Sequence, residues 1–426
     1  MRWWGWSAVL ALVVSVTMVA VVEARTPHRP HPPHKPRRPR APRTADGGDV
    51  PLPPANVHFD AAGTIDLPGR GLALAWSPDA TRIAVGGRFR ERASGLRYDT
   101  RVADVEAATL EKSFACHYFW VIATAWTRNP FLGEIIADGG GDHAIKLWDP
   151  TGTGSATCKP GQFPAAAGAV RALPEIDGWT TALAFSPDGR FLAGASRDRM
   201  IRIWQLEPGP DQFRVVSALY DREAGNFASV AWLPDGLVTG DRRGRVVAWD
   251  VDVDRDRWDV GTIAAFAALS YEAQVGWCAA NEALVSPAQR WIDGGHGWVW
   301  NVRVAPPGDR VAGIGTDGVL SVFDAASGGV VYRTAGPRKA ALHALDWSPD
   351  GALIAAGGSD EDVYVFTADT GAVYDRLPGH ADVVSAVAWR PDGRALASTA
   401  GGPRISLALL NVATGPDQTI RLWTRR

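Results

Sequence analysis

Two histidines stand where they could act as catalytic bases. His296 and His380 each follow a glycine, and a histidine can remove a proton from a substrate within hydrogen-bond reach. Catalysis would also need a nucleophile or a second ionisable group beside it. The chain contains no Gly-x-Ser-x-Gly, no phosphate-binding loop and no His-Glu-x-x-His. The sequence therefore offers no local catalytic motif, and we predict no catalytic residue.

A run of alternating aspartates resembles a calcium-binding loop but does not fit one. The sixth position of an EF-hand loop is Gly and the twelfth is acidic. Arg255 and Gly261 occupy these positions here, so the template fails. A charged outer strand that repels edge pairing is the better interpretation. The chain also lacks Cys-x-x-Cys, and we predict neither a metal nor a cofactor. The aspartates of the run are Asp250, Asp252, Asp254 and Asp256.

The elements that carry these residues are copies of one repeat. In each, an apolar strand leads into Ser-Pro-Asp-Gly or a variant, and two further strands follow. Proline sets the first central position of such a turn, and Asp and Gly suit the next ones. Seven copies with no long helical period predict an all-β repeat array. Strong copies lie at 72–85, 182–195, 230–240, 344–357 and 386–398, and weaker ones at 121–137 and 299–314.

The third strands of the repeats end near an aromatic residue, often followed by aspartate. Examples are AIKLWDP at 144–150, MIRIWQL at 200–206, RVVAWDV at 245–251 and TIRLWTR at 419–425. With these Trp-Asp pairs and the Gly-His dipeptides, residues 57–426 resemble the WD-repeat β-propeller family. The resemblance implies a seven-bladed β-propeller.

The resemblance also implies structural roles for particular residues. In the family, a histidine, a serine, a turn aspartate and the strand tryptophan form a buried hydrogen-bonded tetrad. His380, Ser398, Asp417 and Trp423 match it in blade seven. Blade four has Arg243 at the position of the turn aspartate. The family thus gives His296 and His380 a structural role. The other turn aspartates are Asp142, Asp198, Asp317 and Asp360.

The two ends of the repeat array predict how the ring closes. The last repeat stops after its third strand, at Trp423. The segment GTIDLPGRG at 63–71 resembles YDRLPGHAD at 374–382, which contains a fourth strand. An open sheet edge invites aggregation, and a closed ring removes it. We therefore expect residues 57–68 to supply the missing outer strand of blade seven.

Aromatic residues and insertions indicate a binding face. In this family the Gly-His loops and the turn aspartates share the top face of the disc. Insertions at 88–99 and 401–415 fall there, and we expect a third, at 251–297, to join them. Aromatic side chains at a concave mouth can anchor a partner, although strand aromatics also pack between blades. The candidates are Tyr118, Phe119, Trp120, Trp179, Trp298 and Trp300.

The N-terminal region differs from the rest of the chain. Residues 1–24 have the pattern of a signal peptide, with an apolar stretch from Trp3 to Val22, and are also long enough for a membrane anchor. Lys and Arg after this segment outnumber those before it, which favours a cytoplasmic orientation if it is an anchor. Export or outward anchoring is the leading prediction and a cytoplasmic-facing anchor the alternative.

Residues 25–56 form a Pro-rich, basic linker. Residues 1–56 contain eight Lys or Arg and three acidic residues, whereas the remainder contains 36 basic and 43 acidic residues. The linker should be extended, and its charges could hold the protein against an anionic envelope surface. His28, His31 and His34 would each lie one polyproline turn apart, about 9 Å, which is too far to share a metal ion.

Cysteine usage leaves one question open. The three cysteines cannot all pair within one chain. Cys116 and Cys158 occupy comparable places at the ends of adjacent outer strands. They could pair after export, but the sequence does not give their separation.

Three functions are compatible with the sequence. The first is a non-catalytic scaffold that binds a protein or peptide on the top face. The second is a propeller hydrolase or lyase with a site in the central channel, and the third is an envelope glycan-binding module. A formal net charge of −2 argues against specific nucleic-acid binding. Ionisable groups converging on the channel mouth would favour the enzyme.

Overall fold

The computed structural model describes residues 53–91, 95–152, 156–157, 169–173, 178–281, 285, 289–293, 297–401 and 417–426. The predicted signal or anchor segment at 1–24 and the predicted linker, up to residue 52, lie outside the described residues. Among the residues described, no helix is both long enough and apolar enough to cross a membrane.

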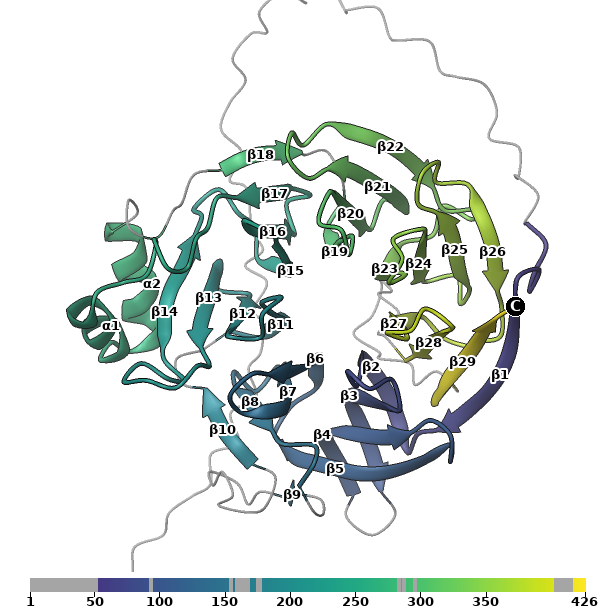
Figure 1. Cartoon of the computed structure of the whole chain (residues 1–426), viewed down its shortest axis with the longest axis horizontal. Coiled ribbons are helices and arrows are strands. Elements are labelled where there is room, and N and C mark those ends of the chain that lie inside the picture. The colour runs from purple at the N-terminus through teal and green to yellow at the C-terminus, as the bar shows by residue number, and fades with distance from the viewer. Residues whose placement is uncertain are drawn as a thin grey trace, which may run out of the picture. The chain divides into compact units, whose positions relative to one another are not determined.

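The described strands form seven antiparallel sheets arranged as blades around a central channel (Figure 1). Blade one contains β2 (Gly69–Trp76), β3 (Arg82–Glu91), β4 (Gly95–Asp104) and β5 (Thr109–His117), with the short β9 (Ala156–Thr157) added in parallel. Blade two contains β6 (Val121–Asn129), β7 (Gly133–Gly140), β8 (Ile145–Trp148) and β10 (Ala169–Leu173).

Blade three contains β11 (Thr180–Phe185), β12 (Phe191–Ser196), β13 (Met200–Gln205) and β14 (Val215–Tyr220). Blade four contains β15 (Phe227–Leu233), β16 (Gly236–Asp241), β17 (Val246–Trp249) and β18 (Gln289–Asp293). Blade five contains β19 (Val299–Val304), β20 (Arg310–Gly315), β21 (Val319–Asp324) and β22 (Val330–Ala335).

Blade six contains β23 (Leu342–Trp347), β24 (Leu353–Gly358), β25 (Val363–Thr367) and β26 (Val373–Leu377). Blade seven contains β27 (Val384–Trp389), β28 (Ala395–Ala400), β29 (Thr419–Arg425) and β1 (Phe59–Asp66). The seven-bladed all-β prediction is therefore confirmed.

The Ser-Pro-Asp turns fold through the same hydrogen bonds in different blades. The Ser77 hydroxyl donates to Asp79 over 2.5 Å and accepts from the Arg82 backbone N–H over 2.9 Å. The serines at 186 and 348 make the equivalent pairs of bonds. A turn that satisfies its own polar groups can end each inner strand without help from neighbouring blades.

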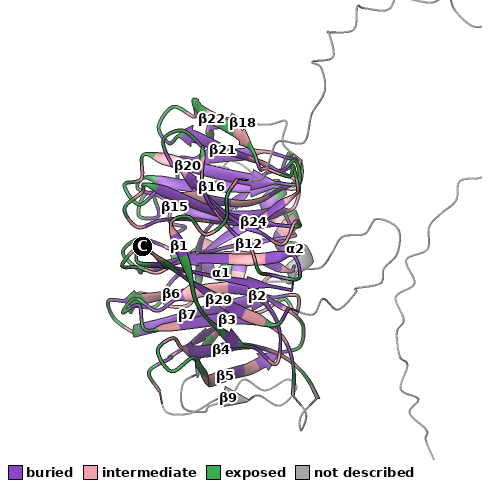
Figure 2. Ribbon diagram, turned by 90° about the vertical axis from the view of Figure 1, so that its right-hand side faces the viewer, coloured by how far each residue is buried: buried purple, intermediate pink, exposed green. Residues whose placement is uncertain are grey.

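Tryptophans at the ends of the inner strands join neighbouring blades. The indole N–H of Trp76 donates to the Ala388 carbonyl of blade seven over 2.9 Å. Trp232 donates to Ala184 of blade three, and Trp347 donates to Arg303 of blade five. The second and third strands are almost wholly buried, whereas loops form the exposed rims (Figure 2). The repeated Ala-Trp and Asp-Trp dipeptides therefore fix the spacing between blades.

The N-terminal strand β1 closes the ring by pairing with β29. Their antiparallel register runs from Phe59 opposite Arg425 to Asp66 opposite Thr419. This pairing confirms the prediction that residues 57–68 complete blade seven. The Asp375 carboxylate in β26 accepts the backbone N–H groups of Val57 and Phe59, each over 3.0 Å, so blade six also holds the closing strand.

The expectation for the insertion at 251–297 was wrong. Within it, α1 (Val260–Ala267) and α2 (Tyr271–Ala280) lie outside β14 on the edge of blade three (Figure 1), and β18 is the outer strand of blade four. Trp258, Phe266 and Cys278 are buried in the same cluster as the residues of β14. Burial of these apolar side chains outweighs any preference for the top face.

The interpretation of the aspartate run as an outer strand was also wrong. Residues 251–256 form a turn, and β18 is the outer strand of blade four. The Arg255 guanidinium lies between Asp250 and Asp256, at 3.4 and 2.8 Å from their carboxylates. Arg255 thus offsets one of the four negative charges of the run.

Candidate binding site at the mouth of the channel

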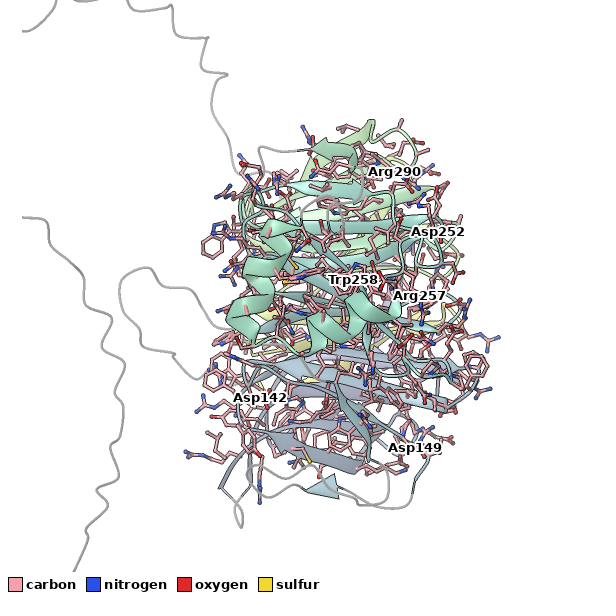
Figure 3. The ribbon with its side chains drawn as sticks, turned by 90° about the vertical axis from the view of Figure 1, so that its left-hand side faces the viewer. Asp142, Asp149, Asp252, Arg257, Trp258 and Arg290 are labelled. Atoms are coloured by element: carbon pink, nitrogen blue, oxygen red, sulfur yellow. The ribbon has the colours of Figure 1, made fainter. Side chains whose placement is uncertain are left out.

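A cavity of about 400 Å³ lies at the mouth of the central channel. Its walls come from the beginnings of the inner strands and from the turns β12–β13 and β16–β17. These turns carry Asp198 and Asp241, so the cavity opens on the face that the family resemblance defines as the top. Figure 3 shows Asp142 at one rim of the propeller and Asp149, Asp252 and Arg290 at the opposite rim. The lining includes Trp120, Trp179, Trp298, Trp300, Arg197, Arg242 and His343.

Four of the six predicted aromatic residues line this cavity. Trp298 is 43% exposed and packs edge-to-face on Trp300, with ring centroids 5.7 Å apart. Phe119 is 37% exposed and does not line the cavity, but its ring centroid lies 5.3 Å from that of Trp179. Tyr118 is 50% exposed, lies beside Lys146 and does not line the cavity. The structure therefore brings together Trp120, Trp179, Trp298 and Trp300, with Phe119 beside Trp179.

The insertion at 88–99 contributes to this face, whereas the insertion at 401–415 is described only at Gly401. Residues 82–91 and 95–104 extend the hairpin of β3 and β4 beyond the length of the corresponding strands in other blades. Tyr98 from this extension stacks on Phe119 with centroids 5.8 Å apart. The extended hairpin thus adds an aromatic side chain beside Phe119.

Arginines interleave with the tryptophans. The guanidinium carbon of Arg197 lies 3.8 Å from the ring centroid of Trp179, and that of Arg242 lies 5.0 Å from the ring centroid of Trp298. Burial lowers the pKa of both arginines, and the charge of Arg242 lowers that of Arg197 further, to about 10. Both remain charged at neutral pH. The mouth therefore has positive charge set into an aromatic wall.

The cavity offers no acid–base pair. Burial lowers the pKa of His343 to about 4, so this imidazole is neutral at physiological pH. No carboxylate is among the described residues that line the mouth. Burial raises the pKa of Asp346 to about 6, opposed by the charge of Arg303, but Asp346 lies in the wall, where it accepts the Trp389 N–H over 2.7 Å. This arrangement suits recognition better than proton transfer.

The blade-seven residues assigned to the tetrad form a hydrogen-bonded chain. His380 Nδ1 lies 2.7 Å from the Asp417 carboxylate, and Nε2 lies 2.7 Å from the Ser398 hydroxyl. The Trp423 indole donates to the same hydroxyl over 2.9 Å. His380 is buried in this network and does not line the cavity, whereas His296 lies outside the described residues.

Blade two contains a version of this arrangement with a second carboxylate. His117 lies between two carboxylates, with Nε2 2.9 Å from Asp138 and Nδ1 2.8 Å from Asp142. Asp138 stands two residues after the partner of Trp148 in β7, the register that Ser398 has in blade seven. Burial alone would lower the pKa of His117, but the two carboxylates outweigh burial and raise it. Hydrogen bonding to His117 and the charges of His117 and Lys146 overcome the opposite effect of burial and lower the pKa of Asp142 to about 2.

The other turn aspartates bind groups of their own turns and strands. Asp198 accepts from Arg202 over 2.7 Å, Asp317 accepts the Val319 N–H, and Asp360 accepts from the Tyr364 hydroxyl. In blade four, where Arg243 stands at the expected position, Asp241 takes over by accepting the Arg243 N–H and the Arg245 side chain. The repeat pattern did not identify Asp241, because Asp241 lies two residues before the expected turn position at 243.

Arg197, Arg242 and His343 were also missed. Arg197 precedes the turn aspartate of blade three, and Arg242 precedes Arg243 at the same repeat position of blade four. Aligning that position across the repeats would have shown two arginines side by side on neighbouring blades. His343 gives no comparable signal, because it follows the first residue of an inner strand and matches no family motif.

The described residues form a seven-bladed β-propeller with an aromatic, arginine-containing cavity at the mouth of its channel. The family "WD domain, G-beta repeat" matches residues 171–205. The family "Anaphase-promoting complex subunit 4 WD40 domain" matches residues 309–390 and 345–416. Together with the seven-bladed architecture, these matches support the resemblance to the WD-repeat family.

Similar proteins include fungal and animal WD-repeat relatives. Nuclear distribution protein PAC1 of Coccidioides posadasii is 29% identical over 183 residues, covering 39% of this chain and 34% of the relative. Nuclear distribution protein nudF 2 of Aspergillus clavatus is 30% identical over 108 residues, covering 25% and 21%. Echinoderm microtubule-associated protein-like 2 of Mus musculus is 25% identical over 242 residues, covering 53% and 36%. The matched regions thus span about a third or less of each relative's length.

Proposed function

We propose that this chain is a non-catalytic scaffold that binds a protein or peptide at the mouth of its propeller. The carrying observation is the cavity lined by Trp120, Trp179, Trp298 and Trp300, with arginines between them and no acid–base pair. Tryptophan and arginine are enriched among residues that dominate binding energy at interfaces. Relatives named as nuclear distribution proteins and a microtubule-associated protein are consistent with a binding role.

The two alternative functions have less support. An enzyme at the channel would need convergent ionisable groups, and the mouth instead presents a neutral histidine and arginines stacked on indoles. A glycan binder needs open indole faces for sugar rings. Arg197 covers a face of Trp179, and Arg242 approaches both Trp298 and Trp300.

Changing Trp120, Trp298 and Trp300 to alanine should abolish partner binding. Hot-spot residues contribute about 2 kcal/mol or more each, so losing even one should weaken binding about 30-fold. Affinity capture with mass spectrometry on the full chain would compare this triple variant with wild type. Phe131→Ala is the matched control, because Phe131 is 53% exposed and lies in the β6–β7 turn, away from the cavity.

The outcomes separate binding from folding. The proposal requires partners retained by wild type and by Phe131→Ala but absent from the triple variant, with the same thermal unfolding profile for all three. A partner set unchanged in the triple variant would contradict it.

We also propose that the propeller is exported or tethered outside the cytoplasm. Cys116 is disulfide-bonded and Cys278 is a buried free thiol. Disulfides persist in oxidising compartments and are rare in the cytosol of mesophiles. The apolar N-terminal segment supports the same proposal, and the basic linker would hold the propeller near an anionic envelope surface.

Thiol titration tests the redox part of this proposal. Protein purified without reductant and unfolded in denaturant should present one reactive thiol, from Cys278, because burial protects that thiol only in the native state. After reduction all three cysteines of the chain should react. Cys158, which lies outside the described residues, is the candidate partner of Cys116. Three reactive thiols before reduction would argue against export.

A further inference from the structure

The arginines at the mouth are held in place by the aromatic wall. The guanidinium of Arg197 stacks on Trp179, and that of Arg242 lies within 5.4 Å of the Trp300 centroid as well as close to Trp298. Arg88 lies 5.8 Å from the centroid of Trp120. Cation–π contacts of this kind fix a long side chain without neutralising its charge. The wall therefore presents guanidinium groups in defined positions.

These arginines differ from their neighbours in having no acidic partner. Arg202, on β13, and Arg245, just before β17, pair with Asp198 and Asp241 at 2.7 and 2.8 Å. Within the described part of the chain, neither Arg197 nor Arg242 forms a side-chain hydrogen bond or ion pair, and the Nε atom of each is buried without an acceptor. The charges of Arg197 and Arg242 are half-buried and repel each other, which costs free energy in the unbound protein. An anionic ligand would reduce this cost by pairing with both.

The lining between the arginines is apolar. Leu72, Ile122 and Val383 contribute to the same cavity as the four tryptophans. The body that surrounds it, residues 57–426, carries more acidic than basic residues, so the arginines of the mouth differ in sign from the net charge of the body. A ligand that fits must combine negative groups with at least one apolar or aromatic side chain.

We infer that the mouth binds an acidic peptide segment, whose carboxylates contact Arg197 and Arg242 while an apolar side chain enters the cavity. This inference rests on the proposed scaffold function and specifies the chemistry of its partner. An anionic glycan fits less well, because the arginines cover indole faces on which sugar rings would stack. A peptide side chain can instead contact the edges of the indole rings, which the arginines leave uncovered, and the apolar lining.

Fluorescence anisotropy with the full chain tests this inference. The probe is a labelled glutamate-rich peptide with one central phenylalanine, and the comparison peptide has glutamine in place of every glutamate. Wild type should bind the glutamate peptide at least about tenfold more tightly than the glutamine peptide, and added salt should weaken that binding. Arg197→Gln with Arg242→Gln should reduce affinity about 100-fold, since each charge-assisted hydrogen bond contributes about tenfold.

A matched variant controls for net charge. Arg199→Gln with Arg243→Gln removes the same charge from the same two turns, and neither side chain lines the cavity. This control should bind like wild type. Equal affinity for the two peptides, or equal loss in the control, would overturn the inference. Tighter binding of oligogalacturonate than of the glutamate peptide would overturn it in favour of an anionic glycan.

The same variants distinguish this inference from the proposed function. If the triple tryptophan variant loses its partners and the Arg197/Arg242 variant keeps them, the scaffold function stands and the acidic-peptide inference fails. If neither variant loses partners, both fail.

Discussion

Replacing Phe59 by alanine should lower the free energy of unfolding by about 3–5 kcal/mol, the usual cost of removing a buried phenylalanine side chain. Phe59 is fully buried and packs edge-to-face on Trp389, with ring centroids 5.7 Å apart. It belongs to a cluster that also contains Leu353 of blade six and Trp423 of blade seven. One side chain on the closing strand thus joins two blades.

Loss of the closing strand should also affect how cooperatively the propeller unfolds. The hydrogen bonds of β1 to β29 and to Asp375 join the beginning of the propeller to its end, in addition to the bond from Trp76 to Ala388. Deleting residues 57–68 would expose the edge of β29 and leave the Asp375 carboxylate without three backbone donors. We expect this deletion to abolish a single cooperative transition and to promote aggregation.

Chemical denaturation followed by tryptophan fluorescence would measure both effects. Thr64→Ala is the control, because Thr64 is exposed on the same strand and its loss should change stability by no more than about 0.5 kcal/mol. A deletion variant that still unfolds in one sharp transition, at the wild-type denaturant concentration, would show that β1 is dispensable for closure.

Features encoded by repetition could be predicted from the sequence. The Ser-Pro-Asp turns and the strand tryptophans recur at fixed spacing because each blade needs the same turn and the same inter-blade contact. Closure by β1 followed from counting strands in the last repeat. In each case the local pattern and the global architecture agree, which is why the pattern was informative.

Features that depend on packing between distant segments could not be predicted in this way. The insertion after Asp250 carries apolar residues such as Trp258 and Phe266, but their spacing does not predict that they pack on β14. The positions of Arg197 and Arg242 are regular in sequence, yet their distance from Trp179 and Trp298 depends on how neighbouring blades are oriented. The candidate site was therefore predicted for its aromatic part and missed for its charged part.

The charge state of blade two was a further feature that the sequence left open. Asp138 lies where blade seven has Ser398, so the histidine of blade two contacts two carboxylates, whereas the histidine of blade seven contacts one carboxylate and one hydroxyl. The Thr100 hydroxyl of blade one also donates to Asp138, over 2.6 Å, so the carboxylate links two blades. Both Asp138 and the His117 side chain are inaccessible to solvent.

Replacing His117 by alanine should therefore destabilise the propeller by about 3–5 kcal/mol near pH 6, because it leaves a buried carboxylate without its cationic partner. The pKa of His117 is raised in the folded state above its ordinary value of about 6.5. A raised pKa stabilises the folded state fully below pH of about 6.5, and this contribution is lost as pH rises through the folded-state pKa. The free energy of unfolding should consequently fall with increasing pH above about 6.5.

Denaturation of wild type, His117→Ala and Asp138→Ser at a series of pH values would test this account. His117→Ala should lose the His117-dependent part of the decline, since it lacks the titrating group. Asp138→Ser should reduce that part, since it removes one of the two carboxylates that raise the pKa of His117 and keeps Asp142. Asp138→Ser should remain the more stable of the two, because it recreates the hydroxyl that His380 contacts in blade seven and leaves no unpaired charge at that position. The same pH dependence in all three proteins would assign the decline to other groups and refute the ionic role of His117.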